Sequence, residues 1–283
     1  MEVQAPAKLN LTLDVLGKRP DGYHDLRMVM QTITLADRVV LEPTQGGEVR
    51  VQSDLSFLPG GEKNLAGAAA LRFYEALGRD CEGLDIALTK RVPVCAGMAG
   101  GSSDAAAVLR ALNELEGTPF TREQLCRIGE QVGSDVPYCV MGGTALAEGR
   151  GEVLTPLPAL PRCWVVVCKP DFPISTPELF GRIDSCRVRC RPDTEGVLAA
   201  LAAGDLGGVA RRMYNVFEDV LLPRQQSAVG EIKHILIECG ALGANMSGTG
   251  PTAFGLFDRE AAAREAFERL HIRYADTFLA QTV

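Results

Sequence analysis

The sequence lacks the features of a membrane-spanning, exported or nucleic-acid-binding chain. No run approaches about 18 consecutive apolar residues, and residues 1–6 contain no basic region followed by an apolar one. Basic residues are not in excess: 29 Lys and Arg stand against 36 Asp and Glu, a net charge of −7. This charge disfavours a general affinity for nucleic acid or for an anionic membrane. We therefore expect a cytoplasmic protein with neither of these partners.

The sequence also lacks any Cys-x-x-Cys pair. Its nine cysteines are odd in number, and several stand in apolar runs such as residues 163–168. This pattern favours reduced, mostly buried thiols in a reducing compartment over a disulfide framework. Metal binding by Cys186 and Cys190 is the alternative, but no matching Cys or His pair accompanies them. We therefore predict no metal ligands in the chain.

The length and composition predict a globular protein of about two domains. The chain has 283 residues, and domains average about 150. Hydrophobic residues make up 46% and charged residues 23%, which excludes a disordered chain. Three prolines within residues 155–162 favour a domain boundary there, giving domains of residues 1–155 and 163–283. Helical and strand patterns alternate irregularly, as is typical of an α+β fold.

Alternation of polar and apolar residues predicts the first strand. Along residues 7–13, Leu9, Leu11 and Leu13 face one way, while the polar side chains between them face the other way. Further strands are predicted at residues 28–35, 38–42, 48–52, 84–89, 163–168, 253–257 and 273–279. An Arg-Pro-Asp-Gly turn at residues 19–22 follows the first strand.

Capping residues predict three helices in the first half of the chain. Asn64 is placed to cap a helix that runs to Leu77 and stops at Gly78. A second helix is predicted to start near Ser102 or Ser103 and to run to about residue 115. A third begins at residue 121 with a capping box and stops at residue 133.

Small residues gather between the strand at 84–89 and the second of these helices. The segment consists of Pro93, Val94, Cys95, Ala96, Gly97, Met98, Ala99, Gly100, Gly101, Ser102 and Ser103. Small side chains let the backbone approach a ligand, and free N–H groups at a helix start favour an anion. The segment is neither a Walker A motif nor a G-x-G-x-x-G fingerprint. It predicts a phosphate-binding loop, with an ordinary flexible loop as the alternative.

Five motifs, in this order, resemble the GHMP kinase superfamily. They are residues 5–10 (Ala-Pro-Ala-Lys-Leu-Asn), 21–24 (Asp-Gly-Tyr-His), 93–103, 133–137 (Gly-Ser-Asp-Val-Pro) and 246–250 (Met-Ser-Gly-Thr-Gly). The resemblance implies a two-lobe α+β GHMP kinase fold. Its N-terminal lobe would be like ribosomal protein S5 domain 2, its C-terminal lobe would be ferredoxin-like, and the active site would lie in the cleft between them. It further implies ATP as co-substrate, bound by residues 93–103 together with Mg²⁺.

The loop departs from the Gly-Leu-Gly-Gly-Gly-Ser-Ser of many members of the family. Met98 stands at the leucine position, which keeps the side-chain volume. Ala99 stands at a glycine position, which is harmless only if the φ angle of this residue is negative.

The first two motifs resemble one branch of the family, which phosphorylates the 2-hydroxyl of a cytidine diphosphate derivative of a methylated erythritol in the non-mevalonate isoprenoid pathway. The resemblance therefore implies an ATP-dependent kinase with this small-molecule substrate, and we expect a monomer or weak homodimer. A GHMP kinase for homoserine or mevalonate is one alternative. A catalytically inactive ligand sensor is another.

The resemblance assigns the catalytic pair to Lys8 and Asp135. Phosphoryl transfer needs an aligned, deprotonated hydroxyl and compensation of the charge on the phosphoryl oxygens. Asp135 would be the base, and Lys8 would supply positive charge to this carboxylate, to the nucleophile or to the γ-phosphate. Without the resemblance, Asp135 would be interpreted as a turn residue and Lys8 as an exposed strand residue.

The resemblance also implies the substrate-binding residues. Tyr23 and Phe180 would sandwich the cytosine ring, and His24 would form a hydrogen bond to its edge. Asn10 would reach the erythritol or phosphate end of the substrate. Thr176 and the Gly-rich residues 247–250 are further candidates. Residues 215–218 match a family motif only loosely and receive no role.

Overall fold

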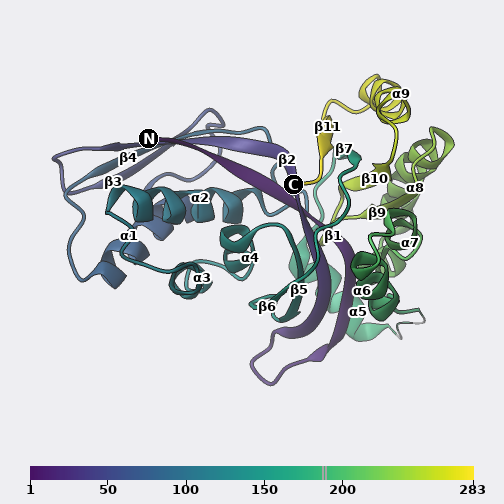
Figure 1. Ribbon diagram of the computed structural model, residues 1–283, viewed down its shortest axis with the longest axis horizontal. Coiled ribbons are helices and arrows are strands. Elements are labelled where there is room, and N and C mark those ends of the chain that lie inside the picture. The colour runs from purple at the N-terminus through teal and green to yellow at the C-terminus, as the bar shows by residue number, and fades with distance from the viewer. Residues whose placement is uncertain (187, 189) are drawn as a thin grey trace. The chain divides into compact units, whose positions relative to one another are not determined.

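The computed structural model describes residues 1–186, 188 and 190–283, and the chain forms two compact units (Figure 1). Unit 1 contains residues 1–7, 36–94 and 99–142, and unit 2 contains residues 8–35, 95–98 and 143–283. Two long strands, β1 (Glu2–Lys18) and β2 (His24–Pro43), contribute residues to both units. Each unit is thus assembled from separate stretches of sequence. The domain boundary at residues 155–162 stays a prediction.

Unit 1 packs helices against strands. Strand β4 (Leu84–Thr89) pairs in parallel with β3 (Val49–Ser53) and antiparallel with residues 38–43 of β2. Figure 1 shows α1 (Leu65–Leu77) and α2 (Gly100–Leu115) side by side next to these strands. The unit also contains η1 (Gly61–Lys63), α3 (Arg122–Glu130) and α4 (Val136–Met141). Buried apolar side chains between helices and strands form the core of this unit.

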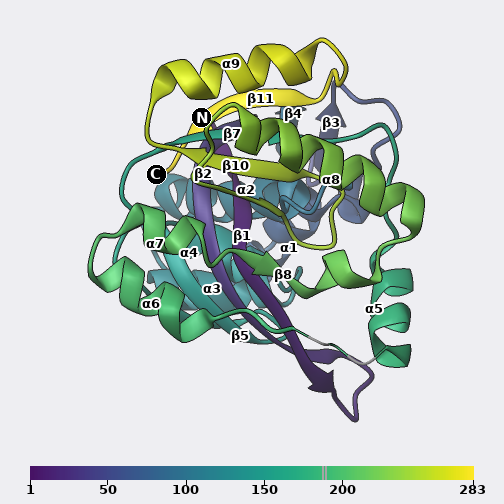
Figure 2. The same cartoon turned by 90° about the vertical axis from the view of Figure 1, so that its right-hand side faces the viewer.

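Unit 2 contains a four-stranded antiparallel sheet in the order β11-β7-β10-β9. The strands are β7 (Trp164–Cys168), β9 (Gly243–Met246), β10 (Ala253–Phe257) and β11 (Thr277–Gln281). Figure 2 shows α8 (Pro223–Glu238) and α9 (Glu260–His271) across one face of this sheet. The helices precede β9 and β11, and this β-α-β-β-α-β arrangement is ferredoxin-like, as predicted.

The rest of unit 2 surrounds the parts of β1 and β2 that belong to it. Strand β5 (Thr144–Gly149) pairs antiparallel with residues 26–31 of β2 and with β6 (Val153–Pro156). Strand β8 (Tyr214–Asn215) pairs in parallel with β1. The remaining helices are α5 (Thr176–Ser185), α6 (Thr194–Ala202), α7 (Leu206–Ala210) and η2 (Val216–Val220).

The capping predictions are confirmed. The Asn64 side chain accepts a hydrogen bond from the N–H of Ala66 at the start of α1, and Gly78 ends this helix in the left-handed conformation with φ +76°. Thr121 and Gln124 form the capping box of α3. The strands predicted at residues 84–89 and 253–257 have the predicted bounds.

Several other predicted boundaries are wrong. Residues 28–35 and 38–42 form one strand, because the buried Asp37 between them is satisfied by tertiary hydrogen bonds and does not break β2. Helix α2 begins at Gly100 rather than near Ser102, because the carbonyl of Ala99 already accepts the first helical hydrogen bond, from the N–H of Ser103 at 2.8 Å. Helix α3 ends at residue 130, and residues 131–132 form a turn. The last strand begins at residue 277, because Tyr274 still donates its N–H to α9.

The cysteines differ from the prediction in their exposure. All nine lie in the described part of the chain and are free thiols, but four are buried and three are exposed, namely Cys95, Cys186 and Cys190. Mostly buried thiols were therefore a wrong expectation. Burial raises the pKa of Cys163 to about 11 and that of Cys168 to about 12, which keeps both protonated and unreactive.

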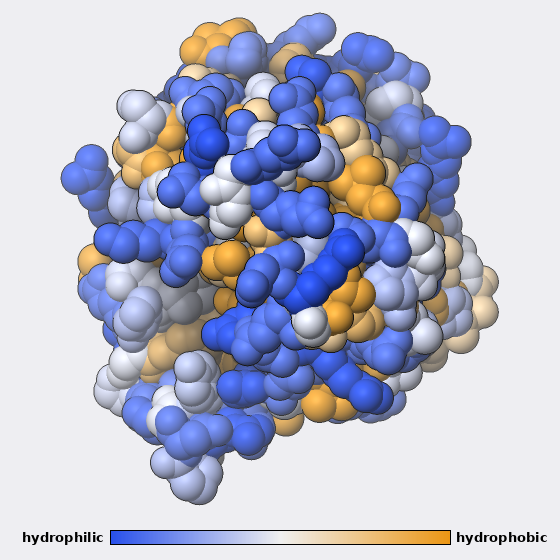
Figure 3. Space-filling model, turned by 90° about the vertical axis from the view of Figure 1, so that its left-hand side faces the viewer, coloured by the Kyte–Doolittle hydropathy of each residue, from blue (hydrophilic) through white to orange (hydrophobic). Residues whose placement is uncertain are grey.

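The surface drawn in Figure 3 carries mostly hydrophilic side chains, with hydrophobic ones scattered among them. None of the helices within residues 1–186, 188 and 190–283 combines the length and the apolar character that crossing a bilayer requires.

Candidate active site

Lys8 and Asn10 lie on the part of β1 that belongs to unit 2, and both are buried, with exposures of 4% and 0%. The Nζ atom of Lys8 donates a hydrogen bond of 2.6 Å to Oδ1 of Asn10, and the backbone N–H of Lys8 donates to the carbonyl of Met98 at 3.2 Å. A buried ammonium group needs such polar partners, because burial penalises the charged form. The interpretation of Lys8 as an exposed strand residue is therefore wrong.

The turn at residues 247–250 contacts both β1 and the first half of the predicted phosphate loop. The hydroxyl of Ser247 donates to the carbonyl of Gly97 at 2.9 Å and accepts from the N–H of Asn10 at 3.3 Å. Gly97 has φ +73°, and a Cβ atom there would lie 2.1 Å from the carbonyl oxygen of Ser247. Only glycine fits at this position. The structure thus joins three motifs that are far apart in the sequence.

Two further candidates also contact each other. The hydroxyl oxygens of Thr176, at the start of α5, and Thr249 are 2.9 Å apart. A hydroxyl pair of this kind presents both a donor and an acceptor to a neighbouring polar group.

The second half of the predicted phosphate loop belongs to unit 1 and forms the start of α2. The N–H groups of a first helical turn have no intrahelical acceptor, so this end of the helix is suited to an anion. Ser103 is buried, and its hydroxyl donates to the carbonyl of Pro6 at 2.6 Å, which fixes the helix start on β1. Ala99 precedes the helix with φ +55°. The substitution of alanine for glycine at this position is therefore strained and not harmless.

A buried charge cluster, missed by the sequence analysis, holds the start of α2. The Nζ atom of Lys90 pairs with Oδ2 of Asp104 at 2.5 Å and with Oδ2 of Asp37. Oδ1 of Asp37 accepts from the backbone N–H groups of Arg91 and Val92, at 2.5 and 2.8 Å. Burial raises the pKa of Asp104 to about 7; Lys90 opposes this shift and Asp37 adds to it. The one signal for this cluster in the sequence was the presence of Asp37 and Asp104 within otherwise apolar patterns.

Asp135 lies in unit 1 and immediately precedes α4. It is half-buried, and its backbone carbonyl accepts the N–H of Cys139 at 3.1 Å. Its carboxylate is not the cap of the helix. The predicted helix end at Gly133 is replaced by a turn in which the carbonyl of Gly133 accepts the N–H of Val136.

The predicted cytosine-binding residues are only partly grouped. The rings of His24 and Phe180 are stacked, with 4.4 Å between centroids and 22° between planes. Tyr23 is 59% exposed and has another partner, since the guanidinium of Arg150 lies 5.3 Å from the centroid of its ring. The structure therefore brings His24 and Phe180 together and leaves Tyr23 facing solvent.

Asp184 is a member of this group that the sequence analysis did not find. Its Oδ1 is 2.7 Å from Nε2 of His24, and its Oδ2 pairs with the Nζ atom of Lys18 at 2.8 Å. The Lys18 ammonium, followed by His24, lowers the pKa of this carboxyl below its ordinary value. Asp184 fixes the imidazole by its edge, as Phe180 does by its face.

No group of three or more His, Cys, Asp and Glu side chains within the described residues is arranged to hold a metal ion.

The fold and the loop motifs together define a kinase of one superfamily. The family model described as GHMP kinases N terminal domain matches residues 64–143, and that described as GHMP kinases C terminal matches residues 197–276. The chain belongs to the GHMP kinase family. As a member of a kinase family it takes ATP as co-substrate.

Individual relatives carry the name of one particular kinase within this family. A 4-diphosphocytidyl-2-C-methyl-D-erythritol kinase of Alkaliphilus metalliredigens is 42% identical, covering 100% of this chain and 96% of that protein. The protein of this name from Exiguobacterium sibiricum is 47% identical, and the match covers 95% of this chain and 93% of that protein. Among solved structures, the crystal structure of a 4-(cytidine 5'-diphospho)-2C-methyl-D-erythritol kinase is 35% identical, with a TM-score of 0.81 and coverage of 100% and 99%.

Proposed function

We propose that the chain catalyses ATP-dependent phosphorylation of the 2-hydroxyl of 4-diphosphocytidyl-2-C-methyl-D-erythritol, which gives the 2-phosphate in the non-mevalonate isoprenoid pathway. The observation that carries this proposal is identity of 42–47% over 95–100% of the chain to relatives named for this kinase activity. Within unit 2, the stacked His24 and Phe180 support a site for a flat ring.

The reaction needs a base, positive charge and a phosphate cradle. We assign the base to Asp135, whose carboxylate would take the proton of the 2-hydroxyl as that oxygen attacks the γ-phosphorus and ADP leaves. The buried ammonium of Lys8, oriented by Asn10, would supply positive charge to the reacting groups. The backbone of residues 93–103 would hold the ATP phosphates.

Mg²⁺ would enter with ATP and offset the charge on its phosphate oxygens. The hydroxyl of Ser103 donates a hydrogen bond to the carbonyl of Pro6 and retains a lone pair, so we assign its oxygen as the protein contact of the ion.

The cytosine ring would stack on aromatic side chains, and such stacking is worth about 1–3 kcal/mol per base. His24 already covers one face of Phe180, so the base would use the other face of this ring or displace His24. The exposed Tyr23 ring would complete the sandwich. Nine free thiols favour a reducing, cytoplasmic setting, and we propose a monomer or weak homodimer.

The test is ADP release from Mg-ATP with the cytidyl-methylerythritol substrate, measured beside homoserine and mevalonate. Turnover with the cytidine substrate alone is the expected result. Turnover only with another alcohol would leave the kinase assignment standing and overturn the substrate. Binding of ATP without turnover of any of them would favour the ligand sensor.

A further inference from the structure

Residues 215–218, to which the sequence analysis gives no role, hold the turn at residues 246–250. Asn215 is 1% exposed. Its Nδ2 donates to the carbonyls of Met246 and Gly248, each at 2.8 Å, and its Oδ1 accepts from the N–H of Phe217 at 3.0 Å. One buried carboxamide thus fixes two carbonyls of the turn, and both of its donor hydrogens are used.

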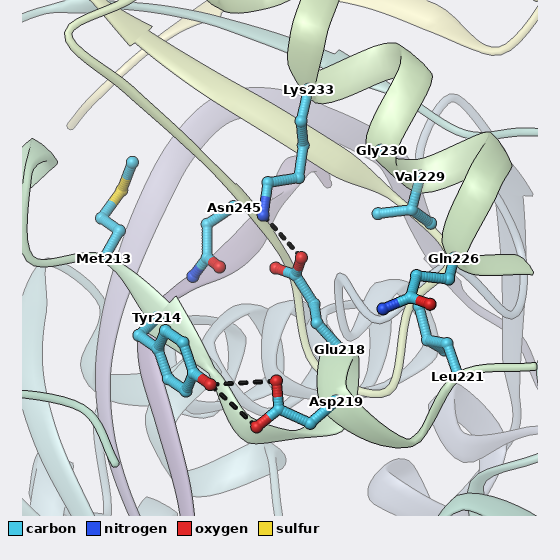
Figure 4. Close-up of a pocket in the computed structure, with 10 residues that line it drawn as sticks. All are labelled: Met213, Tyr214, Glu218, Asp219, Leu221, Gln226, Val229, Gly230, Lys233 and Asn245. Atoms are coloured by element: carbon cyan, nitrogen blue, oxygen red, sulfur yellow. Dashed lines mark hydrogen bonds and ion pairs between the residues drawn. The ribbon is translucent and has the colours of Figure 1, made fainter. Parts of the chain in front are cut away.

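Glu218 holds the same turn from its other side. Its Oε1 accepts from the backbone N–H of Met246 at 3.0 Å, and its Oε2 pairs with Nζ of Lys233 at 2.5 Å. Figure 4 shows Glu218 paired with Lys233, and both residues line a cavity of about 290 Å³. The N–H and the C=O of Met246 are therefore both bonded to side chains of one short segment.

The turn at residues 246–250 also determines the positions of two candidate site segments. Ser247, at its centre, links the N–H of Asn10 to the carbonyl of Gly97. Gly248 has φ +56°, and a Cβ atom there would lie 2.8 Å from the carbonyl oxygen of Gly97. Because the two backbone segments are closely packed, a shift of the turn must move Gly97 or break its hydrogen bond to Ser247.

We propose that Asn215 and Glu218 are positioning residues for phosphoryl transfer, which fix the turn at residues 246–250 and through Ser247 set the spacing between the substrate-binding strand at Asn10 and the phosphate loop at Gly97. The inference rests on the proposed function, which assigns Asn10 to the substrate and Gly97 to ATP. A displacement of about 1 Å among reacting groups costs up to about 100-fold in rate, so outer residues of this kind affect catalysis without touching the substrate.

A purely structural role is the alternative, because Asn215 also caps η2. The substitution Asn215→Asp separates the two roles. Aspartate keeps the oxygen that accepts the N–H of Phe217 and is a good capping residue, but its carboxylate cannot donate to Met246 and Gly248. At Glu218, a Gln substitution keeps an oxygen for the N–H of Met246, whereas Leu removes it.

Two control variants leave the hydrogen bonds to the turn in place. Tyr214 donates its hydroxyl to both carboxylate oxygens of Asp219, at 2.9 and 2.8 Å, beside the same cavity (Figure 4). Tyr214→Phe removes this bond without touching the turn. Lys233→Met removes the partner of Glu218, and since the cavity borders this carboxylate, it stays solvated and can still accept from Met246.

The experiment combines kcat and KM for both substrates with hydrogen–deuterium exchange of the amides at residues 246–250, measured without substrate. Asn215→Asp and Glu218→Leu are expected to lower kcat by about 10- to 100-fold and to speed exchange in the turn. Glu218→Gln, Tyr214→Phe and Lys233→Met are expected to stay close to the parent chain in both measurements.

Asn215→Asp with a lower melting temperature but unchanged kcat, KM and exchange would overturn the proposal. If that variant does not fold, the pair Glu218→Leu and Glu218→Gln decides: equal activity of the two would overturn it. Should the parent chain not phosphorylate the cytidine substrate, the proposed function fails. The exchange rates then test the positioning of the turn on their own.

Discussion

The imidazole of His24 lies on the phenyl ring of Phe180, with 4.4 Å between the ring centroids, while Nε2 of the same imidazole lies 2.7 Å from Oδ1 of Asp184. The ring is therefore held by a face and by an edge. A histidine held in this way presents its remaining nitrogen in a fixed direction, which suits recognition of the edge of a base.

We expect Phe180→Leu to raise KM for the cytidine substrate by roughly 5- to 150-fold, since stacking on an aromatic ring contributes about 1–3 kcal/mol per base. KM for ATP should stay unchanged. Steady-state kinetics with each substrate varied in turn will measure both. Phe57→Leu is the control, because Phe57 is 70% exposed in the other unit. An equal rise in both KM values would contradict a specific contact with the base.

We expect Asp135→Asn to lower kcat by about 10²- to 10⁴-fold, the usual contribution of a general base. The amide keeps the size of the side chain but cannot take the proton of the hydroxyl. Binding of ATP, measured by calorimetry, should change little. Ser134→Ala is the matched control, since it alters the exposed neighbouring residue of the same turn. Near-normal turnover of Asp135→Asn would exclude this residue as the base.

We expect Ala99→Gly to stabilise the chain by about 0.5–1 kcal/mol, because Ala99 has φ +55°, where a Cβ atom is unfavourable. Ala96→Gly, in the same loop, is the control. Ala96 has no positive φ and is buried, so glycine there should destabilise by about 0.4–1 kcal/mol. Urea unfolding of both variants will give the free energies. Stabilisation by both substitutions, or by neither, would rule out strain at Ala99.

We expect the stability of the parent chain to fall, relative to Asp104→Asn, as the pH rises through about 7. Burial raises the pKa of Asp104 from 3.8 to about 7, so the folded chain binds this proton more tightly than the unfolded chain does. The stabilising contribution is therefore present at low pH and is lost as the pH rises through the folded-state value.

Thermal melts of both chains at about pH 5.5 and about pH 8.5 will test this, since the amide of the variant does not ionise. The melting temperature of the variant minus that of the parent should increase between the two conditions. Asp80→Asn, at an exposed position, should give a constant difference. A difference for Asp104→Asn that is the same at both pH values would contradict the raised pKa.

Local signals in the sequence predicted local structure well. The cap at Asn64 and the capping box at Thr121 involve residues within three positions of each other, and both are confirmed. The order of the motifs predicted the family and the ferredoxin-like sheet. Short-range hydrogen bonds and motif order can be read along the chain because they do not depend on how distant segments meet.

Tertiary partners could not be predicted in this way. Lys90 pairs with a carboxylate 53 positions away, and His24 contacts Asp184 over 160 positions. Asn215 meets Met246 over 31 positions, through the backbone of its partner, which carries no sequence signature at all. Such contacts depend on packing, so a polar residue inside an apolar pattern was the most that the sequence offered.

The hydrogen bonds of Ser247 have a consequence for the time course of folding. They join segments that are 150 and 237 residues apart in the chain, and the entropy lost in closing such long loops must be compensated before these bonds contribute. Local helices and the neighbouring strands of each unit can form earlier. We expect the catalytic apparatus to be assembled in the last kinetic phase of refolding, later than most of the backbone around it. Pulse-labelling of amide hydrogens would then find the N–H of Asn10 among the last to become protected.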